Sequence, residues 1–414
     1  MRIAFVSPLP PAPTGIADYA SDVLALLATG HEVEAFHDQE AVDTTRLPGA
    51  CRVLRAERLA ARHAKQRFDV FVYQMGNAPG HGYLYPLLER FPGLLVLHDL
   101  VLHHARARMF LDSPEVRAYA AEPWNAARRG AARAPLSQYA AELRHAYPEQ
   151  AARLMDAQLG TVGPLLPYAY PLWHRPVEAS RVVAVHNEFM AAALREEAAS
   201  RPVVRIPMPM TRTPVPTEAV AALRARYGLG PNDFVVGCFG LVTPEKRVGT
   251  VAMAVARAAV HLPGLRLMLV GPTPDRAGLE RSLEQAGVGT PVIVTDRVPF
   301  EELPAHMALA DLAVHLRYPT ARETSAALLR LLAQGRATVI SDLEHLADVP
   351  EDAVVRVDVR DEEGGVMRAI LRLSGRREAR EGLGARAAAF VARAHAPACA
   401  LEGYERALAT ARTA

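Results

Sequence analysis

Lys246, one of only two lysines in the chain, stands in a loop of the kind that binds phosphate. The loop, at 240–247, follows an apolar run at 234–239 and precedes an amphipathic stretch. A lysine at the start of a helix opposes the helix dipole, but its compact ammonium is well placed for a bound pyrophosphate. We therefore expect Lys246 to bind an anion, with a solvated loop lysine as the alternative.

A second loop, at 7–15, is stiffened by prolines and ends in Gly15, where a phosphate could approach the backbone closely. The alternative is that Gly15 only permits a tight turn before a helix. The sequence contains no GxGxxG motif, which argues against a nicotinamide or flavin dinucleotide site.

A third loop of this kind contains Arg317 and then Glu323, Thr324 and Ser325 at the expected start of a helix. The Glu323 carboxylate could accept sugar hydroxyl groups while the N–H groups of Thr324 and Ser325 face a phosphate. Alternatively, Thr320 and Glu323 have the spacing of a capping box, which would make Glu323 a helix cap.

Three polar residues directly follow buried apolar runs in the first half of the chain, namely His98, Asp99 and His186. Ligands of parallel sheets bind beyond the carboxyl ends of the strands, so we expect these side chains at a ligand crevice. Together with His103 and His104, the first two could instead form a metal cluster. The absence of tetrahedral ligand spacing disfavours that alternative.

The elements that position these loops form two α/β halves, because apolar runs alternate with amphipathic stretches in both. The fold class is therefore α/β, with two doubly wound parallel sheets. Strands are expected at 2–6, 33–36, 69–73, 94–97, 181–185, 203–206, 234–239, 265–270, 292–295, 312–316 and 337–340, and helices at 16–27, 83–90, 248–260, 279–286, 302–310, 323–334, 376–394 and 401–411.

The first half is interrupted at about 100–170 by an Ala/Arg/Glu-rich stretch, which we interpret as a helical insertion. The proline-rich segment 207–216 is the best domain boundary. We expect an N-terminal domain at 1–208, a C-terminal domain at 212–396, and a final helical segment at 397–414 that could pack on either.

Composition excludes several classes of protein. The 47 basic and 45 acidic residues give a net charge of +2, which is no footprint for a dedicated nucleic-acid-binding protein. The three cysteines lack CxxC spacing, which favours a reducing cytoplasm over a disulfide framework. No apolar run approaches the roughly 20 residues that span a bilayer.

Taken in order, these motifs resemble the GT-B glycosyltransferases of the large retaining family 4, also called group 1. The resemblance covers most of the chain, the helical insertion being least covered. It implies two Rossmann-like domains that face each other across a cleft, with the last helix packed on the first domain. The segments that carry it lie at 10–19, 31–33, 98–99, 182–188, 240–246, 270–272, 323–325 and 338–342.

The resemblance implies a role for each candidate residue. Lys246 would hold the donor diphosphate, and Glu323 and His98 would be the catalytic residues at the transferred sugar. No metal or resident cofactor is expected, because the lysine and backbone dipoles stabilise the leaving nucleoside diphosphate. The other expected donor-binding residues are Gly15, Arg247, Gly271, Arg317, Thr324 and Ser325, and the expected acceptor side includes Asp18, Tyr19, Asp99 and His186.

Three positions depart from the family pattern. Leu241 replaces an arginine that binds the diphosphate, a role that Arg247 or Arg317 would have to take over. Leu331 replaces a glutamate that binds the nucleotide ribose. Arg322 replaces a glycine, and would crowd or clamp the sugar site.

We therefore expect a metal-independent retaining glycosyltransferase that moves a sugar from a UDP- or GDP-sugar to a glycan or lipid-linked acceptor, with a role in polysaccharide biosynthesis. One alternative is a GT-B nucleotide-sugar epimerase. Another is a degenerate relative that binds glycan or nucleotide without turnover, which Leu241 and Leu331 favour. No nucleic-acid partner is expected. The expected location is the cytoplasm, and a lipid acceptor would bring the Arg-rich segment 128–133 to the inner membrane face.

Overall fold

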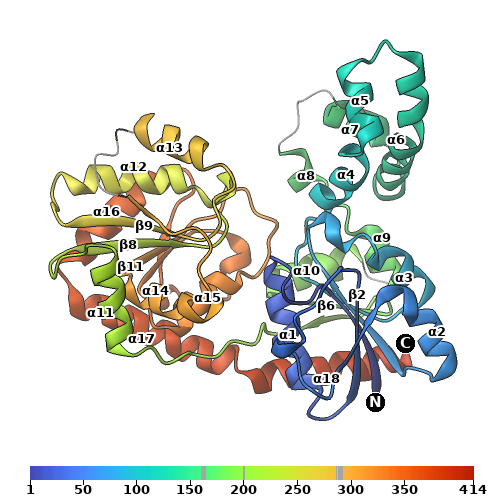
Figure 1. Cartoon of the computed structure of the whole chain (residues 1–414), viewed down its shortest axis with the longest axis horizontal. Coiled ribbons are helices and arrows are strands. Elements are labelled where there is room, and N and C mark those ends of the chain that lie inside the picture. Colours follow the sequence, from blue (N-terminus) through green and yellow to red (C-terminus); the bar gives the residue numbers. More distant parts are fainter. Residues whose placement is uncertain (160–164, 199–200, 286, 288–291) are drawn as a thin grey trace. The chain divides into compact units, whose positions relative to one another are not determined.

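The computed structural model describes residues 1–159, 165–198, 201–285, 287 and 292–414 (Figure 1). The chain forms two compact units, each described here by itself. Unit 1 consists of Met1–Pro209, Ala321–Thr324 and Ala398–Ala414, and unit 2 of Met210–Thr320 and Ser325–Pro397.

Unit 1 is built on a seven-stranded sheet in which every strand pairing is parallel, as predicted. The strands are β1 (Arg2–Val6), β2 (Glu32–His37), β3 (Arg52–Arg55), β4 (Val70–Met75), β5 (Leu94–Leu97), β6 (Val182–Val185) and β7 (Val203–Arg205), in the order β3-β2-β1-β4-β5-β6-β7. The helices are α1 (Gly15–Leu27), α2 (Leu59–Lys65), α3 (Leu84–Arg90), α4 (His103–Leu111), α5 (Pro114–Ala121), α6 (Ala126–Ala146), α7 (Ala151–Leu159), α8 (Leu166–Ala169), α9 (His174–Ala179), α10 (Glu188–Glu197) and α18 (Pro397–Thr413).

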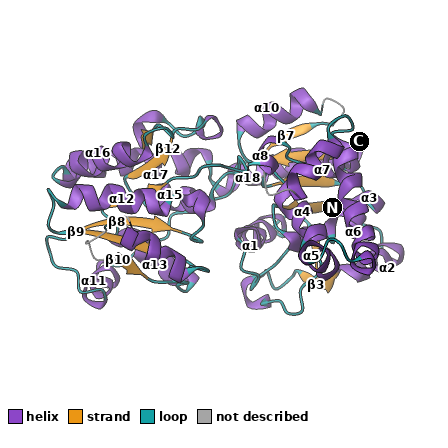
Figure 2. Ribbon diagram, turned by 90° about the horizontal axis from the view of Figure 1, so that it is seen from above, coloured by secondary structure: helices purple, strands orange, loops and turns teal. Residues whose placement is uncertain are grey.

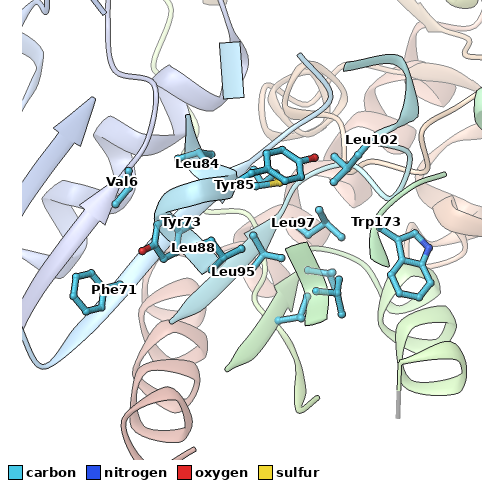
Figure 3. Packing of buried hydrophobic residues seen from close by; sticks show 14 of the residues in the cluster. Val6, Phe71, Tyr73, Leu84, Tyr85, Leu88, Leu95, Leu97, Leu102 and Trp173 are labelled. Carbon is cyan, nitrogen blue, oxygen red and sulfur yellow. The ribbon is translucent and has the colours of Figure 1, made fainter. Parts of the chain in front are cut away.

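The central strands of unit 1 are continuous apolar runs because the sheet is covered on both faces. Every residue of β5 and β6 is buried, whereas the edge strands β3 and β7 are partly exposed. Tyr73 of β4, Leu88 of α3, Leu95 of β5 and Trp173 just before α9 belong to one buried hydrophobic cluster (Figure 3).

Unit 2 repeats the architecture with a six-stranded parallel sheet and helices on both faces (Figure 2). Its strands are β8 (Phe234–Phe239), β9 (Leu265–Val270), β10 (Val292–Val294), β11 (Leu312–His315), β12 (Thr338–Ser341) and β13 (Val355–Val357), in the order β10-β9-β8-β11-β12-β13. Its helices are α11 (Thr217–Arg226), α12 (Val248–Ala259), α13 (Arg276–Gln285), α14 (Leu303–Leu309), α15 (Ala326–Ala333), α16 (Glu362–Ser374) and α17 (Arg377–Ala394).

Alternate residues of the unit 2 strands enter two different cores, as the period of a strand requires. Val236 and Leu267 pack with α12 and α16 on one face of the sheet. Val235 and Met268 pack with α11 and α14 on the other. In both sheets the strand order changes direction at one point, between β1 and β4 and between β8 and β11, which is where ligands bind in open α/β sheets.

The sequence prediction was wrong about one helix start that matters for the site. The helix expected at 323–334 begins at Ala326, because Ser325 is its N-cap and its hydroxyl accepts a hydrogen bond from the Leu328 N–H at 3.3 Å. Thr320 and Glu323 therefore form no capping box, and Glu323 lies in the loop before the helix. Strands β3 and β13 were not predicted, and the expected end of α13 at residue 286 lies outside the described residues.

The helical insertion was predicted, and α4 to α8 form it (Figure 1). Buried Glu142 of α6 binds the guanidinium groups of Arg106 at 2.6 Å and Arg175 at 3.0 Å, and the Arg106 guanidinium lies 3.9 Å from the ring centre of Tyr85. The insertion is thus joined to α3 and α9 by an ion cluster that is shielded from water.

His103 of α4 is fully buried in the insertion. Its Nδ1 lies 2.5 Å from the Tyr170 carbonyl oxygen and its Nε2 lies 2.5 Å from the Tyr139 hydroxyl. Both ring nitrogens are used by the fold, so the metal cluster considered from the sequence does not form around His103. Burial lowers the pKa of His103 to about 4.

Acid should therefore destabilise unit 1 through His103. The unfolded chain takes up a proton below pH 6.5, whereas the buried ring does not, so stability falls as the pH drops from 6.5 towards 4. One such histidine contributes a loss of about 1.3 kcal/mol between about pH 7.5 and 5.5. Urea unfolding at both pH values should show a smaller loss for His103→Gln than for the wild type, and equal losses would contradict the assignment.

Candidate functional site

The predicted phosphate loop of unit 2 lies at the carboxyl end of β8. Residues Pro244–Lys246 form the short helical turn η4, and the Lys246 ammonium donates a 2.8 Å hydrogen bond to the carbonyl oxygen of Phe239, the last residue of the strand. The side chain thus folds back over the strand end at the point where the strand order changes direction. A cation held there can neutralise an anion at the edge of the sheet.

Two glycines make room for this arrangement. Gly240 has φ +99°, and a Cβ atom there would overlap with the Lys246 ammonium nitrogen. Gly271, after β9, has φ +144°, and a Cβ atom there would overlap with the Gly240 carbonyl oxygen. Both positions therefore require glycine for backbone conformation and for space.

The region around Lys246 is electrostatically positive. Cys238, Gly240, Lys246 and His315 line one small pocket at the ends of β8 and β11. Burial lowers the pKa of His315 well below its usual range, and the charges of Lys246 and Arg317 lower it further. Burial also raises the pKa of the Cys238 thiol to about 12. Histidine and thiol are therefore neutral at pH 7, and the pocket keeps a positive charge for an anion.

Arg247 is held by the fold of unit 2. Its backbone is left-handed, with φ +56°, and its guanidinium Nε donates a 2.8 Å hydrogen bond to buried Glu362. Glu362 also accepts a 3.0 Å hydrogen bond from the Ser341 hydroxyl, which itself accepts one from the Arg317 N–H at 3.1 Å. This network joins the loop after β11, the end of β12 and the start of α16 to Arg247, which follows Lys246.

The predicted histidines of unit 1 lie together. His98, after β5, and His186, after β6, are buried, and His98 Nδ1 is 3.1 Å from His186 Nε2. The edge of the Tyr19 ring faces both imidazoles, at centroid distances of 4.7 and 5.1 Å. Burial lowers the pKa of His98 well below its usual range, and His186 and His81 lower it further, so the ring is neutral at pH 7.

The second ring nitrogen of His98 is hydrogen-bonded as well. His98 Nε2 lies 2.8 Å from the Gln74 carboxamide, which lies 3.2 Å from the hydroxyl of Tyr404 in α18. The Tyr404 hydroxyl in turn lies 2.7 Å from that of Tyr19. Both nitrogens of His98 are therefore hydrogen-bonded within the protein.

The two acidic residues expected on the acceptor side are both engaged with their neighbours. The Asp99 carboxylate accepts a 2.8 Å hydrogen bond from the N–H of Asn77, which follows β4. Asp18, in the first turn of α1, binds the Arg46 guanidinium at 2.8 Å. Asp99 therefore orders the loop after β4, and Asp18 connects α1 to the segment before β3.

Gly15 does not serve the tight turn that was considered from the sequence. It is the first residue of α1, where the Thr14 hydroxyl caps the helix by accepting a 3.0 Å hydrogen bond from the Ile16 N–H. Its φ is not in the left-handed range, and a Cβ atom would meet nothing within 4 Å. The fold therefore leaves open space at Gly15, beside the first turn of a helix.

The loop that carries Glu323 is part of unit 1, although its neighbours in sequence belong to unit 2. Asn187, the N-cap of α10, donates hydrogen bonds to the Arg322 carbonyl at 3.0 Å and the Thr324 hydroxyl at 3.1 Å. The N–H of Leu100 donates one to the Ala321 carbonyl at 3.0 Å. Glu323 is thus held beside the residues that follow β5 and β6, and it is 9% exposed.

The three departures from the family pattern have different surroundings. Leu331 is fully buried among Val235, Phe239 and their neighbours, so the position serves the core of unit 2. Leu241 is 46% exposed on the phosphate loop. Arg322 has φ +62°, a conformation that glycine adopts without strain, and its guanidinium lies 5.1 Å from the ring centre of Phe189.

Several residues at these sites were missed by the sequence analysis. Gln74 and His315 are polar residues near the ends of apolar strands. A polar residue at such a position was the signal that could have predicted them as site residues. Glu362, Asn187 and Tyr404 reach the sites only through folding and gave no local signal.

A comparison with protein families matches residues 233–375, most of which belong to unit 2, to the family described as Glycosyl transferases group 1. Among curated proteins, the chain is 37% identical over 94 residues to the GDP-mannose-dependent alpha-(1-6)-phosphatidylinositol monomannoside mannosyltransferase of Mycolicibacterium smegmatis, which is 23% of this chain and 24% of that protein. The Mycobacterium tuberculosis H37Rv protein of the same name is 38% identical over 93 residues, 22% of this chain and 24% of that one. The match spans about a quarter of the length of these curated relatives.

Solved structures resemble the chain over nearly its whole length. Sucrose-phosphate synthase of Thermosynechococcus elongatus has a TM-score of 0.66 at 19% identity, covering 98% of both chains. Anabaena HepE in complex with UDP-glucose has a TM-score of 0.66 at 14% identity, covering 98% of this chain and 99% of that one. WaaG, a glycosyltransferase involved in lipopolysaccharide biosynthesis, has a TM-score of 0.62 at 14% identity, covering 97% and 98%. These likenesses establish the GT-B fold.

The two loop glycines should respond differently to alanine. Gly240→Ala should lower the stability of unit 2 by about 2 kcal/mol or more, because the backbone is left-handed and Lys246 occupies the space. Gly15→Ala should leave the melting temperature unchanged or raise it slightly, since alanine favours a helix start with open space. Thermal unfolding followed by circular dichroism measures both, and an equal loss in the two variants would contradict this assignment.

Proposed function

We propose that the chain is a retaining group 1 glycosyltransferase that uses a sugar nucleotide as donor, because residues 233–375 match that family and the fold is GT-B. The observation that carries the proposal is the positive pocket at the ends of β8 and β11. There the Lys246 ammonium lies over two obligatory glycines, and buried His315 stays neutral. A cation at this edge of the sheet suits the diphosphate of a sugar nucleotide.

In the proposed reaction, the bond between the sugar C1 and the diphosphate oxygen breaks, and an acceptor oxygen bonds to C1 on the same face. The acceptor proton passes to the departing diphosphate oxygen. Lys246 and Arg317 neutralise the charge that develops on the diphosphate, which we expect to make a metal ion unnecessary. Glu323 binds hydroxyl groups of the transferred sugar, with Thr324 and Ser325 at the phosphate.

The proposed donor is a UDP-sugar or a GDP-sugar. The curated relatives are named as GDP-mannose-dependent enzymes, whereas HepE is in complex with UDP-glucose. Leu331 belongs to the core of unit 2. In this proposal, groups elsewhere in the site therefore bind the ribose. Arg247 contributes charge near the site while it is bound to Glu362.

The proposed acceptor is a lipid-linked saccharide or a surface glycan. The names of the curated relatives specify a phosphatidylinositol mannoside, and WaaG is named for lipopolysaccharide biosynthesis. Within the part of the chain that the structure describes, no helix is long and apolar enough to cross a membrane.

A peripheral contact is proposed at Trp124, which is 77% exposed in the turn between α5 and α6, where Arg129 binds the Pro123 carbonyl. Co-sedimentation of wild type and Trp124→Ala with anionic vesicles tests this contact.

A second candidate is a relative that binds a sugar nucleotide without turnover. The burial of Leu331 and the exposed Leu241 favour it, because neither position supplies the polar group that the family pattern has there. Binding of a sugar nucleotide without release of nucleoside diphosphate would support this second candidate. Interconversion of the free sugar nucleotide without acceptor would instead identify an epimerase.

Lys246→Ala should weaken sugar-nucleotide binding by about 100-fold, since it removes a charged hydrogen bond donor from the diphosphate. Isothermal titration measures the dissociation constant. Lys65→Ala is the matched control, because it removes the only other lysine from exposed positions of α2. Unchanged affinity in folded Lys246→Ala would exclude Lys246 from the donor site.

Glu323→Gln should lower kcat by about 100-fold while the melting temperature changes by less than about 2 °C, because Glu323 caps no helix and would act on the sugar. The variant keeps shape and size, so donor affinity should change little. A proportional loss of stability and turnover would indicate a structural role. Release of nucleoside diphosphate in the presence of acceptor measures turnover.

A further inference from the structure

A continuous chain of buried hydrogen bonds runs across the carboxyl ends of the unit 1 strands. Its members come from separate elements: Tyr19 from α1, Tyr404 from α18, Gln74 from β4, His98 after β5, His186 after β6, and the Ile206 carbonyl after β7. The side chains of Gln74 and Tyr404 are fully buried, and the other three are at most 6% exposed. Such a network has to be satisfied at every member.

The hydrogens in this chain can be counted. The Ile206 carbonyl, 2.8 Å from His186 Nδ1, needs a donor there, and one hydrogen must lie between the two rings. With the Gln74 oxygen facing His98 Nε2, a third ring hydrogen is required. Two neutral imidazoles carry only two.

Two ring hydrogens are enough when the Gln74 carboxamide presents its NH₂ group to His98. This orientation exchanges the carboxamide oxygen and nitrogen, which have nearly the same size. The Gln74 oxygen then accepts from the Tyr404 hydroxyl, which accepts from that of Tyr19. His98 donates from Nδ1 to His186, and His186 donates from Nδ1 to the Ile206 carbonyl. All donors then point in one direction, and the His98 ring is neutral, as its burial favours.

We propose that Tyr404, placed by the C-terminal helix α18, is a positioning residue that sets the tautomer and the ring plane of His98 through Gln74. In this arrangement Tyr404 supplies the hydrogen that the Gln74 oxygen accepts, which favours the carboxamide orientation with the NH₂ group towards His98. The helix thereby belongs to the unit 1 site as well as to its core. His98, with both nitrogens bound, is thereby held in one orientation and as a neutral group.

The structural part of this inference stands on the hydrogen-bond geometry, and its effect on turnover rests on the proposed function. Tyr73 of β4 provides a matched control. Its hydroxyl is also buried and donates to the Phe91 carbonyl at 2.8 Å, but it is adjacent to Gln74 on the strand and lies on the opposite face. Tyr73→Phe therefore removes a buried hydroxyl without touching the chain.

The first measurement is the ¹⁵N spectrum of the imidazole groups in the full-length protein, with His98 assigned by His98→Gln. The wild type should show His98 as a single neutral tautomer with its hydrogen on Nδ1. Tyr404→Phe should move this signal or divide it between tautomers, and Tyr73→Phe should leave it unchanged. An unchanged His98 signal in Tyr404→Phe would overturn the inference.

A second variant keeps the test decisive if Tyr404→Phe does not fold. Gln74→Glu has the same shape, and its carboxylate cannot donate when it is ionised, so at a pH that ionises Glu at this position His98 Nε2 should acquire a hydrogen and its ¹⁵N signal should shift. A His98 signal that keeps its hydrogen on Nδ1 alone in Gln74→Glu would contradict the assigned direction of the chain.

The second measurement is kinetic. Tyr404→Phe should lower kcat about tenfold with KM for the sugar nucleotide within about twofold, because the donor site of unit 2 is untouched. Tyr73→Phe should lower only the melting temperature. An equal loss of kcat in both variants would reduce Tyr404 to a core residue. If the wild type shows no transfer, the proposed function fails, while the imidazole spectrum still decides the positioning role.

Discussion

A single ammonium group at the end of β8 constrains the local structure of unit 2. Lys246 folds back onto the Phe239 carbonyl, and this position is possible only because Gly240 leaves the space that a Cβ atom would fill. Gly271 then lets the neighbouring loop approach the Gly240 carbonyl. The positive charge that results lowers the pKa of His315 in addition to the effect of burial. A cationic pocket in which the titratable neighbours stay neutral is suited to a phosphate-bearing ligand.

The equivalent edge of the unit 1 sheet carries a hydrogen-bond network in place of a cationic pocket. Two tyrosines, a glutamine and two histidines are bound to each other there in a chain that extends from Tyr19 to the Ile206 carbonyl. Such a site orients groups rather than attracting charge. The charged sugar nucleotide is accordingly proposed for unit 2. The Glu323 loop, which Asn187 holds in unit 1, is the segment proposed to bind hydroxyl groups of the transferred sugar.

The sequence predicted the features that depend on local pattern. The strands β5, β8 and β9 have the predicted bounds because each is a continuous apolar run that ends at a polar or glycine residue. The edge strand β3 was missed because it has only four residues, with an arginine at each end, and is only partly buried. The start of α15 was misplaced because two cap patterns overlapped, and the Ser325 hydroxyl, rather than Thr320, caps the helix. Contacts such as Gln74 with Tyr404 join residues 330 positions apart, so no local pattern could predict them.

The central claim, that the cationic pocket of unit 2 holds the diphosphate of a sugar nucleotide, is tested most directly by thermal unfolding with a panel of UDP-, GDP-, ADP-, CMP- and dTDP-sugars. A ligand that binds only the folded protein raises the melting temperature by mass action. Our account predicts a selective rise with a UDP- or GDP-sugar that is lost in Lys246→Ala and kept in Lys65→Ala. No rise with any sugar nucleotide in the folded wild type, or an equal rise in Lys246→Ala, would contradict it.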